Sequence, residues 1–223
     1  ENLFPREKAV VVWNGSTGGV DLSRFDCSKR NEWRQQIRSE LGYGEDDFVF
    51  GFVGRITRDK GINEILEAFS ACKSEAKLLL VGAEEGLDTL DQTLLQNARQ
   101  DPNIQFHHPV SDVERYYAAI DILLLPSYRE GFGNVIIEAA AVGTPAIVSN
   151  IPGPIDAIEK DKTAYVIPPK DVAALTAAMK KSMIKSNGLS SEYCANFAAE
   201  KFDSKKLCKK IFDRKRKLLY GNG

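Results

Sequence analysis

Two carboxylates with seven residues between them frame the stretch of this sequence that is best suited to chemistry. Glu130 and Glu138 flank Gly131-Phe132-Gly133, and the whole stretch follows the apolar run 120–125. The pattern predicts a strand, a glycine-rich loop and then a helix that carries Glu138 on an apolar face. Glycines let backbone N–H groups approach a ligand, and a helix N-terminus carries partial positive charge, so an anion such as phosphate fits here. Ionised carboxylates accept hydrogen bonds that sugar hydroxyls donate, so we expect a ligand that is part sugar and part phosphate.

A second loop supplies fixed positive charge. Arg55 and Lys60 lie between Gly54 and Gly61, directly after the apolar run 48–53. Arginine can bind phosphate oxygens in a bidentate manner, and lysine is a compact point charge. Preorganised cations of this kind can stabilise a leaving diphosphate without a metal ion. Alone, such a loop is more often a solvated surface; beside the two carboxylates, phosphate binding is the better interpretation.

The elements that must position these loops alternate between strand and helix. Continuously apolar strands are typical of a parallel sheet that is covered on both faces, so we predict an α/β, doubly wound, Rossmann-like sheet with ligands at the carboxyl ends of its strands. Ser28 and Asp112 are expected to cap helices, and Gly42 to end the first one. The predicted strands are 9–12, 48–53, 77–81, 104–107, 121–125, 145–149 and 164–167, and the predicted helices include 28–41, 62–72, 87–95, 112–120, 172–183 and 203–220.

Composition narrows the class of protein. The 223 residues are 43% apolar and 27% charged, with a net charge of -1, so nothing points to a nucleic-acid partner. No apolar run is long enough to span a bilayer, and no signal peptide is visible. The cysteines form no C-x-x-C pair, which favours reduced thiols, and the adjacent His107 and His108 would point to opposite faces of a strand and could not grip one metal together.

Read together, these motifs resemble those of the retaining GT-B glycosyltransferases of family 4, the glycosyl transferases group 1, and specifically their C-terminal donor-binding domain. Residues 130–138 match the E-x7-E motif, and residues 54–61 are similar to the G-R-x-x-x-x-K-G loop. Val81-Gly82, Pro126-Ser127 and residues 143–147 also fall where the family places them. The resemblance covers most of residues 8–185, and the order of the motifs makes it more specific than either one alone.

The resemblance implies a nucleotide diphosphate sugar as donor, with a UDP-sugar slightly favoured, and neither a metal nor another cofactor. Arg55, Lys60 and Glu130 would serve catalysis: the two cations would stabilise the leaving diphosphate, and Glu130 would contact hydroxyls of the transferred sugar without acting as a general base. Glu138 would bind the ribose hydroxyls. The full donor-binding set is Gly54, Arg55, Lys60, Val110, Glu130, Gly131, Phe132, Gly133, Asn134, Val135 and Glu138.

Three residues near the predicted site can be interpreted either as ligand contacts or as structural residues. Phe132 can pack beneath the loop, and Asn134 can cap the following helix as readily as contact the ligand. The family commonly reads F-x-G-x-V near the base, where this sequence has Phe106-His107-His108-Pro109-Val110. His108 stands in the glycine position, and we expect it to point outward, so the nucleotide base is left open.

The implied reaction is transfer of a hexosyl group, with retention, to a saccharide or lipid-linked acceptor in bacterial cell-surface polysaccharide synthesis. We expect residues 1–27 to be a hinge linker with its first strand, 28–187 the nucleotide-sugar-binding domain and 188–223 C-terminal helices. The N-terminal acceptor domain of the same enzyme would then be a missing partner, and this part alone would turn over little. The alternatives are a nucleotide-sugar 2-epimerase and a non-catalytic nucleotide-sugar binding module.

The C-terminal helix raises the question of location. Residues 203–220 combine apolar positions with eight Lys and Arg residues between 205 and 217. A basic amphipathic helix can lie on anionic lipid, which suggests weak contact with a membrane surface, although a solvated face is the more common outcome for a charge run. We expect a cytoplasmic protein, peripheral at the inner face of the membrane if this contact forms.

Overall fold

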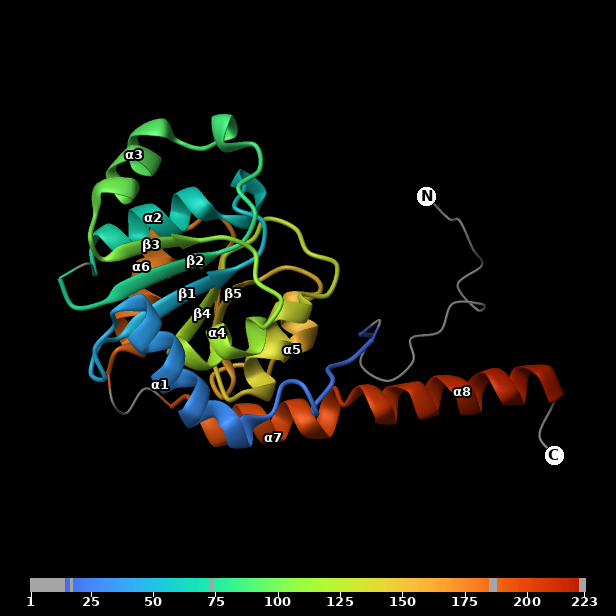
Figure 1. The fold of residues 1–223 in the computed structure, drawn as a ribbon. Coiled ribbons are helices and arrows are strands. Elements are labelled where there is room, and N and C mark those ends of the chain that lie inside the picture. Colours follow the sequence, from blue (N-terminus) through green and yellow to red (C-terminus); the bar gives the residue numbers. More distant parts are fainter. Residues whose placement is uncertain (1–14, 17, 73, 185–187, 221–223) are drawn as a thin grey trace.

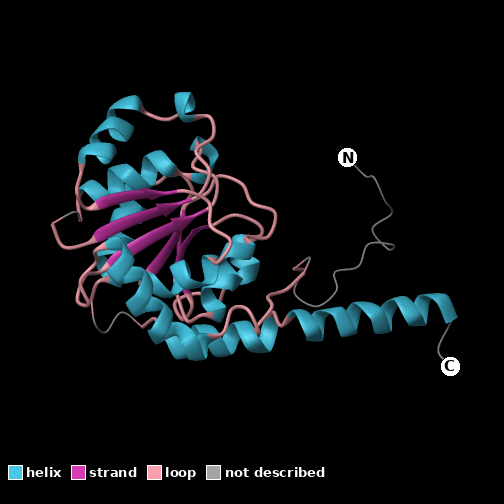
Figure 2. Ribbon diagram, in the orientation of Figure 1, coloured by secondary structure: helices cyan, strands magenta, loops and turns pink. Residues whose placement is uncertain are grey.

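The computed structural model describes residues 15–16, 18–72, 74–184 and 188–220, which form a six-stranded sheet with helices on both faces (Figure 1; Figure 2). The strand order is β3-β2-β1-β4-β5-β6, and every neighbouring pair is parallel. The prediction of a doubly wound, Rossmann-like sheet is confirmed. The strands are β1 Val49–Val53, β2 Lys77–Val81, β3 Ile104–His107, β4 Ile122–Leu125, β5 Ala146–Ser149 and β6 Ala164–Ile167.

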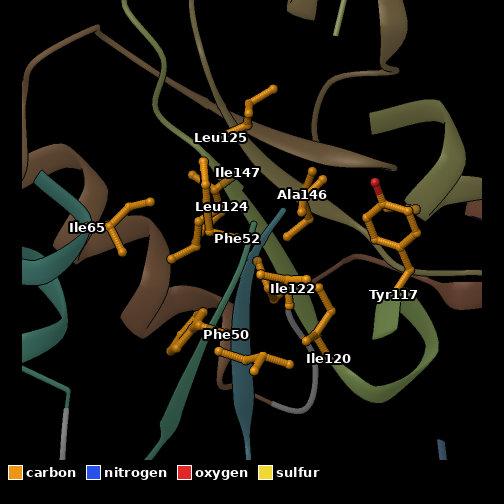
Figure 3. Close-up of a cluster of buried hydrophobic side chains, with 14 of the residues drawn as sticks. Phe50, Phe52, Ile65, Tyr117, Ile120, Ile122, Leu124, Leu125, Ala146 and Ile147 are labelled. Carbon is orange, nitrogen blue, oxygen red and sulfur yellow. The ribbon is translucent and has the colours of Figure 1, made fainter. Parts of the chain in front are cut away.

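The central strands form the core because both of their faces are covered. All four residues of β4 and all four of β5 are buried. Figure 3 shows side chains of β1, β4 and β5 packed together, with Tyr117 beside them. Gly51 in β1 leaves the room that Ile120 fills, because a Cβ atom there would lie 2.5 Å from the Ile120 Cδ1 atom. Continuous apolar strands therefore pack as the sequence pattern predicts.

Helices lie in two layers. On one face α1 contacts α4, α4 contacts α5, and α5 contacts α7, whereas α2 contacts both α3 and α6 on the other (Figure 1). The first layer comprises α1 Arg30–Leu41, α4 Val113–Ala119, α5 Asn134–Ala141 and α7 Ser191–Lys201, and the second α2 Ile62–Ser70, α3 Gln92–Gln100 and α6 Val172–Ser182. Short 3-10 turns are η2 Cys27–Lys29, η3 Arg58–Lys60, η4 Leu87–Thr89 and η5 Pro154–Ala157.

Several local predictions were wrong where side-chain hydrogen bonds decide the outcome. Asp26, rather than Ser28, caps the start of the first helical segment, since its carboxylate accepts from the Ser28 backbone N–H. Asp112 occupies the N-cap position of α4, but its carboxylate accepts from Arg115 instead of from the backbone. Gly42 ends α1 in the left-handed conformation, as predicted.

The predicted helix 87–95 is divided. Residues Leu87–Thr89 form η4, and α3 begins only after Asp91, whose carboxylate accepts from the backbone N–H groups of Thr93 and Leu94. The 62–72 helix ends early at Ser70. The predicted strand 9–12 lies outside the described residues.

The last helix, α8 Ser204–Tyr220, extends away from the folded body (Figure 1). Leu207 near its start is buried, while Phe212, Leu218 and Leu219 are exposed. None of the helices described here is both long enough and apolar enough to cross a bilayer.

Candidate functional site

The two predicted ligand loops meet at the carboxyl edge of the sheet. Residues 54–61 follow β1, and residues 126–133 follow its neighbour β4. The direction of strand order reverses between β1 and β4, which is where ligands bind in sheets of this kind. The Tyr128 backbone N–H donates to the Asp59 carbonyl oxygen at 2.9 Å, so the loops are tied directly to each other.

Gly61 makes this close approach possible. Its φ of 78° is left-handed, and a Cβ atom there would lie 2.5 Å from the Pro126 carbonyl oxygen. Any other residue would therefore be strained and would collide with the neighbouring loop.

Lys60 and Glu130 are the charged pair at this junction. Lys60 Nζ lies 2.6 Å from Glu130 Oε1, and the two side chains are only 17% and 13% exposed. Ser127 donates a second hydrogen bond, of 3.0 Å, to the same carboxylate oxygen. The structure thus brings these two predicted residues together, and each neutralises the other in the protein without ligand.

Arg55 does not join them. Its guanidinium lies 3.2 Å from the Glu85 carboxylate in the loop after β2, and both side chains are at least half exposed. Gly82 allows the loops after β1 and β2 to run side by side, since a Cβ atom on it would fall 1.8 Å from the Gly54 carbonyl oxygen. The predicted pair of phosphate-binding cations is therefore divided between two partners.

The start of α5 offers open backbone. Gly133, at a φ of 84°, is the N-cap residue, so Asn134 is not a cap and its side chain is exposed. No atom of the described residues would lie within 4 Å of a Cβ atom on Gly131. Phe132 packs edge-on against Phe202 with ring centroids 5.8 Å apart, as its packing interpretation predicts. The loop therefore presents N–H groups at a helix N-terminus, an arrangement that suits an anion.

Glu138 on α5 has a partner that the sequence did not reveal. The buried hydroxyl of Tyr117 on α4 donates to Glu138 Oε2 at 3.0 Å. Burial raises the pKa of Glu138, whereas the Tyr117 hydrogen bond acts in the opposite direction. No local pattern marks Tyr117, which lies among the buried residues of α4 like any core residue. Val135, one turn before Glu138, is partly buried.

Arg24 is a second residue that sequence reasoning missed. Its guanidinium donates to Glu114 Oε2 at 2.8 Å and to the Ser111 carbonyl oxygen at 2.5 Å, and so braces the segment that follows Val110. The Arg24 charge also lowers the pKa of Glu138, against the larger effect of burial and the opposing charge of Glu114. Val110 itself is partly buried.

The two adjacent histidines differ in their exposure and in their hydrogen bonds. His108 is exposed, as predicted. His107 lies within 3.0 Å of the His108 carbonyl oxygen through Nδ1, and within 3.2 Å of the Tyr116 hydroxyl through Nε2. Because a carbonyl only accepts, Nδ1 donates to it, and in the neutral imidazole Nε2 accepts from the Tyr116 hydroxyl.

Other candidate sites are weaker. Across the described residues, no three His, Cys, Asp or Glu side chains gather as a metal site requires. A cleft of about 620 Å3 between α2 and α3, lined by residues such as Leu66, Phe69 and Leu94, shares no residue with the ligand loops.

Comparisons with known proteins place these features in a family. The family model of glycosyl transferases group 1 matches residues 34–201. The chain is 33% identical over 183 residues to the capsular polysaccharide biosynthesis glycosyltransferase CapM of Staphylococcus aureus, covering 81% of this chain and 47% of that protein. It is 35% identical over 163 residues to the putative teichuronic acid biosynthesis glycosyltransferase TuaC of Bacillus subtilis, covering 73% and 39%. The chain thus spans less than half the length of these relatives.

A solved structure has the same fold. The Anabaena protein HepE, in complex with UDP and glucose, superposes with a TM-score of 0.74 at 21% identity, covering 88% of this chain and 54% of that one. At this identity the likeness concerns the fold alone.

Proposed function

The chain belongs to the glycosyl transferases group 1 family, with a GT-B type Rossmann-like sheet, and we propose that it is the donor-binding part of a nucleotide-sugar-dependent glycosyltransferase. The observation that carries the proposal is the meeting of Lys60 and Glu130, from the loops after β1 and β4, at the switch point of the sheet. A phosphate-binding cation and a sugar-binding carboxylate are adjacent there, as a sugar diphosphate requires.

In this proposal the donor lies along the carboxyl edge. Glu138 accepts hydrogen bonds from the ribose hydroxyls, with Val110 near the base. The start of α5, from Gly131 to Asn134, and Lys60 receive the diphosphate. Glu130 accepts from the transferred sugar, and Lys60 moves from Glu130 to the phosphates when the donor enters.

Arg55 reaches the diphosphate only if it leaves Glu85. Both side chains are exposed and their pair is weak in water, so this exchange costs little. Two cations on the diphosphate would then stabilise the negative charge that develops as the sugar–phosphate bond breaks.

The transfer breaks the bond between the sugar C1 atom and the diphosphate and forms a bond from C1 to an acceptor hydroxyl oxygen. We propose retention by attack on the face from which the diphosphate leaves, with the acceptor proton passing to the leaving phosphate oxygen. The names of the two relatives support a role in bacterial surface polysaccharide synthesis, and the UDP bound to HepE supports UDP as the nucleotide.

Calorimetric titration of the chain with UDP, GDP and ADP in EDTA tests the site. We expect one nucleotide to bind, and Lys60→Ala and Glu138→Ala to weaken it. Unchanged binding in both variants would show that the nucleotide binds at another place on the protein. Binding that requires added metal would contradict the proposed role of the cations.

Two further parts of the proposal concern partners. We propose that an N-terminal domain of the same enzyme supplies the acceptor site, so this part binds donor and transfers little sugar; turnover equal to that of the whole enzyme would contradict this. We also propose that α8 can rest on an anionic membrane surface at the cytoplasmic face, because its exposed Phe212, Leu218 and Leu219 accompany a basic surface. Failure to bind anionic vesicles at low salt would exclude that contact.

A further inference from the structure

Tyr128, in the loop after β4, contacts the segments that follow β1 and β6, beside the Lys60–Glu130 pair. Its backbone N–H binds the loop after β1, and its hydroxyl donates to Glu64 Oε1 on α2 at 2.6 Å. Lys170, from the loop after β6, places Nζ 4.5 Å from the centre of the Tyr128 ring. Burial and the Glu64 hydrogen bond raise the pKa of Tyr128 to about 12, while Arg58 acts on the same hydroxyl in the opposite direction. Tyr128 is therefore a fixed support for two cations, Arg58 and Lys170.

Among the described residues, these two cations have no close counter-ion. Within the described part of the chain, neither Arg58 nor Lys170 has a carboxylate oxygen within 4.0 Å, although Lys60 and Arg55 both do. Arg129 adds a third cation at the rim: it lies 3.6 Å from Asp59, and its side chain is 84% exposed. Arg58 and Lys170 thus reach Tyr128 from separate loops with no described carboxylate within 4.0 Å of either, and the Glu64 carboxylate accepts from the Tyr128 hydroxyl instead of from the cations. Two such cations attract an anion.

The backbone at Lys170 points to the same conclusion. Its φ is 61°, in the left-handed region that a residue with a Cβ atom rarely adopts. It lies between Pro168-Pro169 and Asp171, the residue that caps α6. A strained conformation that directs a lysine onto a ligand-loop tyrosine is the kind of feature that functional sites retain.

We propose that Arg58 and Lys170, supported by Tyr128, form a subsite for an oxyanion next to Glu130. The group it takes is a carboxylate or phosphate, carried either by the transferred sugar or by the acceptor. The inference rests on the proposed function, because Glu130 marks the position of the sugar. If the subsite exists, the sugar or the acceptor carries an anionic group in addition to the diphosphate of the donor.

Calorimetry on the whole chain separates the two sources. In one arm, UDP-glucuronic acid and UDP-glucose are compared, so that only a sugar carboxylate differs. In the other, inorganic pyrophosphate is titrated into chain saturated with UDP. In the first arm, a charge-assisted contact at a partly exposed site should give about a fivefold to tenfold preference for UDP-glucuronic acid. In the second, it should give pyrophosphate about a fivefold to tenfold preference for the wild-type chain over the variants below.

Variants locate the effect. Lys170→Met and Arg58→Gln should abolish the preference and leave affinity for UDP within about twofold. Lys181→Met is the matched control, because Lys181 lies 4.0 Å from the Tyr165 ring at the far end of α6, and it should keep the preference. If UDP binds and neither arm depends on Arg58 or Lys170, the subsite does not exist. If UDP does not bind, the proposed function fails and the subsite fails with it.

Discussion

Replacing Tyr117 with phenylalanine removes one hydroxyl and leaves the ring in the core. That hydroxyl is the donor to Glu138 at 3.0 Å, and Tyr117 is fully buried. The variant therefore leaves a largely buried carboxylate without the hydrogen bond that offsets its burial. We expect the free energy of unfolding to fall and the proposed contact between Glu138 and the ribose to weaken.

The magnitude follows from the charge on the acceptor. A hydrogen bond to a charged group contributes about 1.5–3 kcal/mol, so the free energy of unfolding at pH 7 should fall by about 2 kcal/mol. In a domain of this size that corresponds to a drop in Tm of about 4–8 °C.

The loss should depend on pH in a defined direction. Burial already raises the folded pKa of Glu138 above its ordinary value of 4.5, and losing Tyr117 raises it further. The carboxyl is protonated in both states below pH 4.5, and the cost of burying its charge appears as pH rises through the folded pKa. The difference between wild type and Tyr117→Phe should therefore be larger at pH 7 than at pH 4.

Denaturant unfolding at both pH values measures this difference. Tyr43→Phe is the matched control, because the buried Tyr43 hydroxyl has no hydrogen-bond partner among the described residues. Its removal should leave stability unchanged or slightly improved. Equal losses in the two variants, or a Tyr117→Phe loss that is the same at pH 4 and pH 7, would refute the reasoning.

Three further changes test neighbouring features. Glu138→Gln should raise stability at pH 7, because no charge is then buried, and the gain should vanish below pH 4.5; the same unfolding experiment measures it, and a gain that is independent of pH would contradict the raised pKa. Lys60→Met should weaken UDP binding about tenfold in calorimetry, since a charge-assisted phosphate contact is lost, and an unchanged Kd would remove Lys60 from the phosphate site. Gly61→Ala puts a Cβ atom 2.5 Å from the Pro126 carbonyl oxygen at a φ of 78° and should lower the free energy of unfolding by about 2 kcal/mol or more. Its control, Gly131→Ala, places the Cβ atom in open space and should melt like wild type. Indistinguishable melting curves for the two variants would argue against the loop contact.

The sheet could be predicted from the sequence because strands that are buried on both faces are mostly apolar along their length. Strands β2, β3 and β6 begin and end at the residues predicted for them. Helix starts were harder to predict, because the N-cap position depends on local side-chain hydrogen bonds in one case and on backbone conformation in the other. Asp26 took that place from Ser28, and Gly133 from Asn134.

The candidate site was predictable as a set of loops but not as a network of contacts. Motif order placed Lys60 and Glu130 at one sheet edge, yet their 2.6 Å contact joins residues that are 70 positions apart. Arg24 and Glu114 are 90 positions apart, and nothing local connects them. Such partners emerge only when packing decides which helices touch.

The ion pair between Lys60 and Glu130 has a consequence for the order of events in a catalytic cycle. Under the proposed roles, a donor that carries both phosphate and sugar satisfies both halves of the pair when it separates them. Once the sugar has been transferred, the remaining nucleotide satisfies only the lysine, and the carboxylate, 13% exposed, keeps the Ser127 hydrogen bond but lacks a cation. Re-formation of the pair then competes with the spent nucleotide for Lys60. The empty site would thus help to expel product and to admit intact donor in preference to it.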